Sequence, residues 1–145
     1  MHVTRGVSAA LVLVALAACG SSSNGLSKAD YISRADAICQ KYNGLAAQAT
    51  ASLTNPTPAQ VVTAVRTKLV PLFERQNEDL AKLKPPAADR ATVQRFVADL
   101  TAATADIGRH TQAFVDAHGA TPLATKAATE AQGYGFKVCA KLATS

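Results

Sequence analysis

From residue 27 onward, apolar residues recur every three or four positions, which predicts a series of helices. The first begins at Ser27, where a Ser-x-x-Asp pattern with Asp30 is typical of a helix N-terminus. It ends before residues 55–58, Asn-Pro-Thr-Pro, which favour a turn. Its apolar positions are Tyr31, Ile32, Ala35, Ile38, Cys39, Tyr42, Ala46 and Ala49.

A second helix is predicted from Thr57, with a proline in its first turn, to the Lys84-Pro85-Pro86 sequence. Pro71 lies within the same pattern. Because proline lacks a backbone N–H, we expect a kink near Lys68 that does not end the helix. The apolar positions are Val62, Val65, Leu69, Leu72, Leu80 and Leu83.

The third predicted helix is the longest, from Ala87 to about His118. Gly119 is a termination signal, and Pro122 follows as a stop. The apolar stripe consists of Val93, Phe96, Val97, Leu100, Ala103, Ile107, Phe114 and Val115. This pattern predicts one unbroken amphipathic helix.

A fourth helix is predicted from about Leu123 to Leu142, with apolar positions at three- and four-residue steps. Its weak point is Gly133-Tyr134-Gly135, since glycine disfavours the interior of a helix. Two interpretations are open at this point. Either a neighbouring backbone comes close there, or the helix is irregular.

These elements predict an all-α, up-down-up-down four-helix bundle over residues 27–145, because short turns place successive helices antiparallel. The composition agrees with this fold. Roughly a fifth of the residues are alanine, and tryptophan is absent. Such a sequence favours closely packed helices over a sheet rich in branched and aromatic residues.

The first 26 residues have a different pattern. A short head with Arg5 precedes an apolar run over residues 7–18, which is typical of a secretory signal peptide. The run ends in Leu16-Ala17-Ala18-Cys19, the lipobox of bacterial lipoproteins. We therefore predict a signal peptide over residues 1–18, lipidation of Cys19 and a flexible tether over residues 19–26, rich in glycine and serine. The alternatives are an ordinary secretory signal and an uncleaved anchor.

Cysteine parity supports export. Lipidation would remove Cys19 from a total of three cysteines, leaving Cys39 and Cys139. These two are free to pair outside the cytoplasm. We predict a disulfide that joins the first helix to the last.

Three segments carry a resemblance to a family. They are Leu26-Ser27-Lys28-Ala29-Asp30-Tyr31-Ile32 with its continuation to Cys39, Leu83-Lys84-Pro85-Pro86-Ala87, and Tyr134-Gly135-Phe136-Lys137-Val138-Cys139. Together they resemble the small helical lipoproteins of actinobacteria, a family of unknown function. The resemblance implies an exported, disulfide-linked helical domain. It carries over no catalytic residue.

Groups that could perform chemistry are scattered. His110 and His118 are eight residues apart, whereas two metal ligands on one helix are spaced by three or four. Glu74 and Glu78 share a helix face and could bind a cation, but a solvated helix face is the favoured interpretation. The sequence has no nucleophile elbow, P-loop or dinucleotide fingerprint, and no long run of like charges. We expect no catalytic residue, metal, cofactor or nucleic-acid partner.

The chain has a formal net charge of +5, and four basic residues lie around one predicted turn. Lys82 and Lys84 flank the end of the second helix, Arg90 begins the third, and Arg75 lies two turns upstream. In an up-down bundle this turn returns to the tethered end. The four residues therefore predict contact with an anionic envelope surface. The alternative is that they only complement the dipole of a helix C-terminus.

These features predict a protein at the extracytoplasmic face of the cell membrane, held by the lipid on Cys19. It would act as a non-enzymatic binding or interaction module in the cell envelope, toward an envelope protein or an anionic surface. The alternative is a bundle that binds an apolar small molecule between its helices, in a cavity with a few polar groups. An enzyme is the least favoured interpretation.

Overall fold

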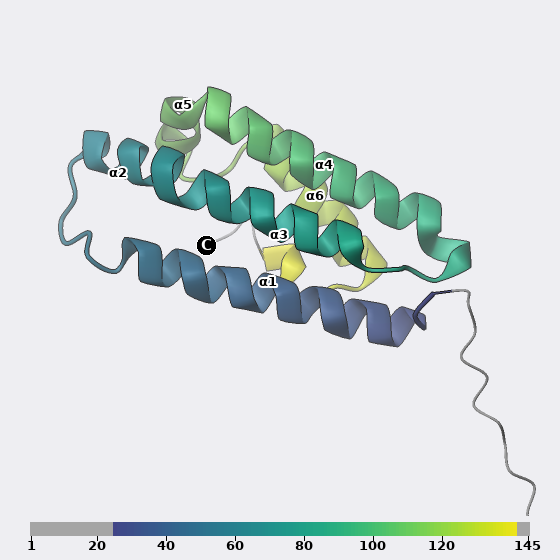
Figure 1. Cartoon of the computed structure of the whole chain (residues 1–145). Coiled ribbons are helices and arrows are strands. Elements are labelled where there is room, and N and C mark those ends of the chain that lie inside the picture. Colours follow the sequence, from purple (N-terminus) through teal and green to yellow (C-terminus); the bar gives the residue numbers. More distant parts are fainter. Residues whose placement is uncertain (1–24, 142–145) are drawn as a thin grey trace, which may run out of the picture.

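The computed structural model describes residues 25–141, in which all regular secondary structure is helical (Figure 1). The elements are α1 (Lys28–Thr50), α2 (Pro58–Ala64), the π-helix η1 (Val65–Leu69), α3 (Val70–Lys82), the 3₁₀ turn η2 (Ala87–Asp89), α4 (Arg90–Arg109), α5 (Thr111–Asp116), α6 (Pro122–Tyr134) and the 3₁₀ turn η3 (Cys139–Lys141). The prediction of an all-α fold is confirmed.

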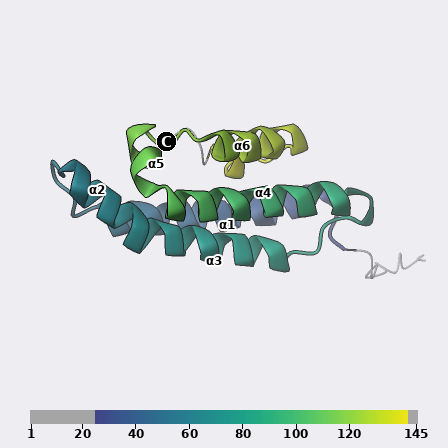
Figure 2. The same ribbon diagram turned by 90° about the horizontal axis from the view of Figure 1, so that it is seen from above.

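Four antiparallel arms form the bundle, and they run up, down, up and down: α1, α2 with η1 and α3, α4, and α6 (Figures 1 and 2). The short helix α5 turns away from the axis of α4 (Figure 2). Along the bundle α1 packs on α3, α3 on α4, and α4 on α6. The segment after α6 contacts both α6 and α1 through η3. In the part of the chain that the structure describes, no helix is long and apolar enough to cross a membrane.

The first helix begins where the sequence predicts. Ser27 Oγ accepts a hydrogen bond from the Asp30 backbone N–H (3.1 Å) and donates one to the Asp30 carboxylate (2.7 Å). These bonds satisfy a backbone donor that the first turn leaves free. The helix ends at Thr50, just before the turn at Asn55, which has a φ of 48°.

The second arm is irregular where Pro71 predicts a kink. Pro71 has no N–H to donate to the carbonyl four residues earlier, on Thr67. The chain responds by widening into η1, in which the Val70 N–H donates to the Val65 carbonyl. The arm then continues as α3, so the prediction of a local distortion near Lys68 that does not end the helix is confirmed.

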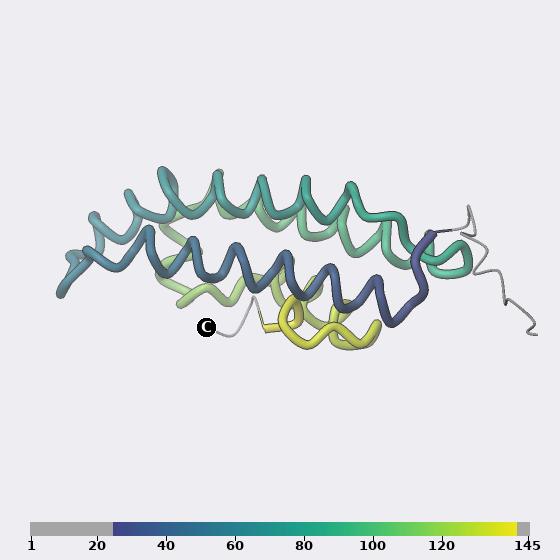
Figure 3. Tube along the Cα trace, turned by 60° about the horizontal axis from the view of Figure 1, so that its bottom comes forward, coloured from purple at the N-terminus to yellow at the C-terminus, as the bar shows by residue number. Residues whose placement is uncertain are grey.

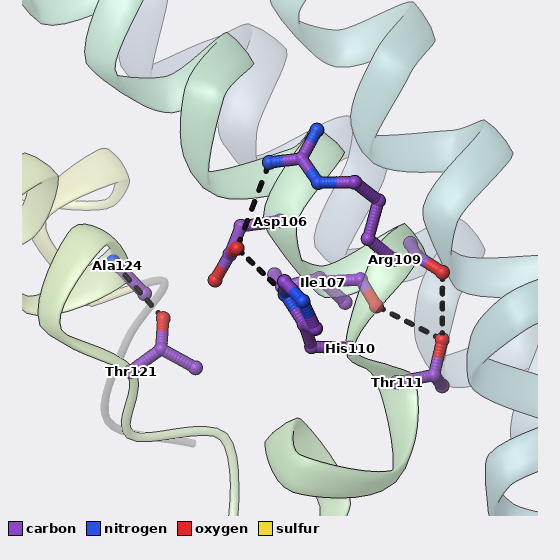
Figure 4. A network of polar contacts seen from close by, with 8 residues as sticks. Asp106, Ile107, Arg109, His110, Thr111, Thr121 and Ala124 are labelled. Atoms are coloured by element: carbon purple, nitrogen blue, oxygen red, sulfur yellow. Dashed lines mark hydrogen bonds and ion pairs between the residues drawn. The ribbon is translucent and has the colours of Figure 1, made fainter.

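The prediction of an unbroken third helix from residue 87 to 118 is wrong. The arm starts as η2 and breaks at His110, whose φ of −119° and ψ of 41° are not helical. At the break, Thr111 Oγ1 donates to the Ile107 carbonyl (2.9 Å), as Figure 4 shows. Such a side-chain bond competes with the backbone ladder and bends helices. The apolar stripe continues through the break, and for this reason the pattern does not reveal it.

The fourth helix ends at Tyr134, so its predicted extension to Leu142 is also wrong. Gly135 adopts the left-handed conformation, with a φ of 110°. The N–H groups of Gly135 and Phe136 both donate to the Ala131 carbonyl (3.2 and 3.0 Å), which closes the helix C-terminus. A Cβ built on Gly133 would meet nothing within 4 Å. The glycines therefore end the helix and do not admit a neighbouring backbone.

Beyond α6 the chain crosses to α1 (Figure 3). There the carboxylate of Asp36 accepts the backbone N–H groups of Lys137 (2.8 Å), Val138 (2.9 Å) and Cys139 (3.0 Å). The predicted disulfide between Cys39 and Cys139 is present, with the Cα atoms 5.3 Å apart. Cys139 lies in η3 and not in a fourth long helix, so the bond ties α1 to the C-terminal segment.

The larger core lies at the end of the bundle where α1 begins. Its aromatic members are Tyr31, Phe96, Tyr134 and Phe136, with neighbouring ring centroids 5.0 to 6.1 Å apart. A smaller cluster of Val65, Val70 and Ile107 lies under η1. The buried core is therefore larger at the end of the bundle where α1 begins than at the end that contains η1.

Candidate functional site

The predicted lipidation site lies outside the described residues, as do the signal peptide and most of the tether. The described chain starts at Gly25, against the turn between α3 and α4. Here the Leu26 N–H donates to the Lys84 carbonyl (3.1 Å). Gly25 has a φ of 95°, and a Cβ there would collide with the Pro85 carbonyl oxygen. Only glycine fits such a close approach at positive φ.

Three of the four predicted basic contact residues gather at this turn. Lys82, Lys84 and Arg90 line a groove of about 740 Å³, which we call the basic groove, and Gly25 lies at its edge. Arg75 is exposed but does not line it. The apolar side chains of the groove are Leu80, Leu83, Val93 and Val97.

The cations of the basic groove are not equivalent. Lys82 Nζ lies 2.9 Å from Asp79 Oδ1, and this carboxylate also accepts the Tyr42 hydroxyl (2.8 Å). Hydrogen bonds from Lys82 and Tyr42 lower the pKa of Asp79 to about 2. Asp79 also pairs with Lys41, whose Nζ lies 3.3 Å from Asp79 Oδ2, so the charge of Lys82 is only partly compensated. Lys84 and Arg90 form no ion pair with any described residue, so their charges are available to an anion in solvent.

At the other end of the bundle lies a larger groove, of about 1020 Å³, which we call the distal groove. It runs between the second half of α1, the α2–η1 segment and α5. Most of its lining is apolar: Ala46, Ala47, Pro58, Val61, Val65, Leu69, Phe73, Phe114 and Val115. The sequence analysis missed this groove, although Pro71 and Gly119 mark two of the irregularities that surround it.

A third group of titratable residues lies between α4 and α6. Lys126 Nζ contacts both oxygens of Asp99 (2.9 and 2.8 Å), which lowers the pKa of Asp99. Desolvation and the nearby Asp99 raise the pKa of Glu130. Burial, with a hydrogen bond to Asp89 (2.7 Å), raises the pKa of Tyr134. These contacts join two helices, and the group has no nucleophile paired with a base.

His110 and His118 lie in different surroundings. His110 Nδ1 lies 2.9 Å from Asp106 Oδ1, in the exposed network of Figure 4. His118 has a φ of 48° and forms part of the turn that ends α5. Among residues 25–141, no group of three or more His, Cys, Asp and Glu side chains could hold a metal ion. The exposed Glu74 and Glu78 gain no third partner.

Comparisons of the chain with protein-family models, with curated proteins and with solved structures give no match. The resemblance to actinobacterial lipoproteins therefore stays a prediction. The functional assignment depends on the two grooves and on the residues that line them.

Proposed function

We propose that the chain is a lipid-anchored, extracytoplasmic protein that acts as a non-enzymatic binding module in the cell envelope. The lipobox at Cys19 supports the anchor. The disulfide between Cys39 and Cys139 supports export, because such bonds persist in oxidising compartments.

The observation that carries the proposal is the position of Gly25 at the edge of the basic groove. Gly25 is six positions after Cys19, and an extended chain spans at most about 3.5 Å per residue. A lipid on Cys19 would therefore hold the groove within about 20 Å of the bilayer surface. Within that reach Lys84 and Arg90 can approach anionic headgroups, and each contributes about 1 kcal/mol when it lies at the surface.

The positions of the basic residues distinguish membrane contact from the alternative, in which they only complement the dipole of a helix. Lys82 is near the C-terminus of α3 and is paired with Asp79, which suits a cation that complements the helix dipole. Lys84 and Arg90 lie outside α3 and lack such a partner. We therefore assign the anionic contact to Lys84 and Arg90, with a smaller contribution from Lys82.

The anchor is tested by Cys19→Ala in the full chain, with Ser21→Ala as the control. We expect the Cys19 variant to lose lipid labelling and to leave the membrane fraction, while the control stays there. A Cys19 variant that is processed normally and remains in the membrane fraction at the wild-type level would contradict the anchor.

The basic groove is tested on vesicles, with the chain from residue 19 carrying Cys19→Ser. Lys84→Glu with Arg90→Glu should weaken binding to phosphatidylglycerol vesicles and flatten its salt dependence, since screening acts over about 10 Å at 0.1 M salt. Arg66→Glu with Arg109→Glu changes the net charge equally at the opposite end of the bundle and is the control. Equal binding of the two double variants would refute a localised contact.

A further inference from the structure

Two apolar hollows meet at the end of the bundle formed by α2 and α5. The outer one is the distal groove. The second, which we call the inner cavity, has a volume of about 60 Å³ and lies between α3, α4 and α6. Phe73, Phe114 and Gly119 line both hollows. The inner cavity therefore adjoins the distal groove at these three residues.

The walls of the inner cavity are mainly apolar, with Leu100, Ala103 and Ile107 on α4. Its polar members are Gln76, Asn77 and Thr104. Two of these satisfy each other: Asn77 Nδ2 donates to Thr104 Oγ1 (2.9 Å), and that hydroxyl donates to the Leu100 carbonyl (3.0 Å). The third polar residue, Gln76, takes no part in these hydrogen bonds.

Gln76 has only 2% of its surface exposed, and its Oε1 atom is buried without a hydrogen-bond partner among the described residues. Buried polar atoms are almost always paired, because an unpaired one loses its bonds to water and gains nothing in return. An unpaired acceptor at a mainly apolar cavity that adjoins a large groove is typical of a ligand site. It calls for a ligand that donates one hydrogen bond.

We propose that this site binds a neutral alcohol with a long apolar chain. The hydroxyl donates to Gln76 Oε1 in the inner cavity, and the chain passes between Phe73 and Phe114 into the distal groove. This inference deepens the proposed binding function and rests on it, since it names the class of ligand that the module carries. The site shares no lining residue with the basic groove, so the two can be tested separately.

The lining selects a neutral ligand. No residue around the inner cavity is ionisable, because Cys139 is held in the disulfide. A carboxylate placed beside Gln76 Oε1 would set two acceptors against each other and lose its hydration without compensation. The apolar side chains of the distal groove, among them Val61, Leu69 and Val115, suit an alkyl chain.

The test measures binding of 1-decanol, decane and decanoate by calorimetry, with the chain from residue 19 carrying Cys19→Ser. We expect 1-decanol to bind about fivefold to tenfold more tightly than decane, which is the worth of one hydrogen bond, and decanoate to bind weakest. No detectable binding of 1-decanol, or tighter binding of decanoate, would overturn the proposal.

Gln76→Leu keeps the approximate size of the side chain and removes the acceptor. It should abolish the preference for 1-decanol over decane, while Gln132→Leu, an exposed position on α6, leaves the preference unchanged. A Gln76→Leu variant that keeps the preference would refute the role of the amide. Should that variant fail to fold, the ranking of the three ligands on the wild-type chain still decides the question.

Methyl NMR of the same chain locates the ligand. 1-Decanol should shift the signals of Ile107 and Val115 and leave those of Ile32 and Val93, at the other end, unchanged. The reverse pattern would place the ligand near the basic groove and overturn the assignment. Vesicle binding through Lys84 and Arg90 is a separate measurement, so failure of one proposal is distinguishable from failure of the other.

Discussion

The two ends of this bundle are built differently. The end next to the tether contains four packed aromatic rings, the disulfide, and a carboxylate, Asp36, that fixes three backbone N–H groups. The opposite end has a π-helix, a break at His110 and a core cluster of three buried aliphatic side chains without an aromatic ring. Only that second end carries a groove of about 1020 Å³.

This contrast shows how a small domain can be both stable and open. Binding sites are drawn from the less stable parts of a structure, because an open groove buries less apolar surface. In this chain the disulfide and the Asp36 hydrogen bonds lie at the end that carries Gly25, and the irregular helices lie at the end that carries the distal groove. The largest effects of mutation should therefore appear at the tether end.

Breaking the disulfide should have the largest effect. The bond spans 100 residues, for which the chain-entropy model gives about 4 to 5 kcal/mol of stability. Cys39→Ala with Cys139→Ala should lower the melting temperature by more than about 10 °C. The measurement is thermal unfolding followed by circular dichroism, and an unchanged melting temperature would contradict a locked tether end.

Asp36→Ala should have the next largest effect. A carboxylate that accepts three backbone N–H groups stabilises by charge-assisted hydrogen bonds, so we expect a loss of about 1.5 to 3 kcal/mol in urea unfolding. Asp116→Ala is the matched control at the other end, where the carboxylate has one side-chain partner, Gln112. Similar losses for both variants would remove the difference between the ends.

Removing the hydroxyl group should have different effects on stability at Tyr134 and Tyr31, two buried tyrosines of the tether end. Tyr134→Phe loses the hydrogen bond to Asp89 (2.7 Å) and should cost about 1 kcal/mol. Tyr31 is fully buried, its hydroxyl has no described partner, and burial raises its pKa to about 12. Tyr31→Phe should therefore be neutral or stabilising in the same urea experiment. A cost equal to that of Tyr134→Phe would show that the Tyr31 hydroxyl is bonded in solution.

The smallest expected effect is that of acid on the contact between α1 and α3 at Asp79. The folded-state pKa is about 2, below the ordinary 3.8, so the contribution is fully present above about pH 4 and is lost as the pH falls through 2. Because Asp79 and its ion-pair partner Lys82 lie near the surface, we expect the ionised carboxylate to add only about 0.5 kcal/mol to the free energy of unfolding. Asp79→Asn should be less stable than wild type at pH 7, and the difference should shrink below pH 4 and vanish only below about pH 2. A difference independent of pH would exclude the ionised carboxylate as its source.

Much of the tether end is predictable from local sequence. Ser27 with Asp30 specifies the start of α1, and cysteine parity specifies the disulfide. The bonds of Asp36 are not predictable in this way, since they join backbone groups about a hundred residues away. The end of α6 at Gly135 is not predictable from apolar periodicity, which continues to Leu142; it depends on the left-handed conformation of Gly135.

The distal end is harder to predict for a physical reason. Apolar periodicity continues through η1 and through the break at His110, because both distortions keep the same face toward the core. Pro71 indicates the first distortion, whereas Thr111 is indistinguishable in sequence from any other threonine in a helix. The unpartnered oxygen of Gln76 depends on the packing of three helices, and no local pattern reports it.

Native-state hydrogen exchange, followed residue by residue, tests the contrast between the two ends most directly. The amides of α1 between Tyr31 and Tyr42 should exchange only through global unfolding, with those of α2, η1 and α5 at least about a hundredfold less protected. Reduction of the disulfide should then remove most of the difference. Equal protection at both ends of the oxidised protein, or greater protection of α5 than of α1, would contradict the account.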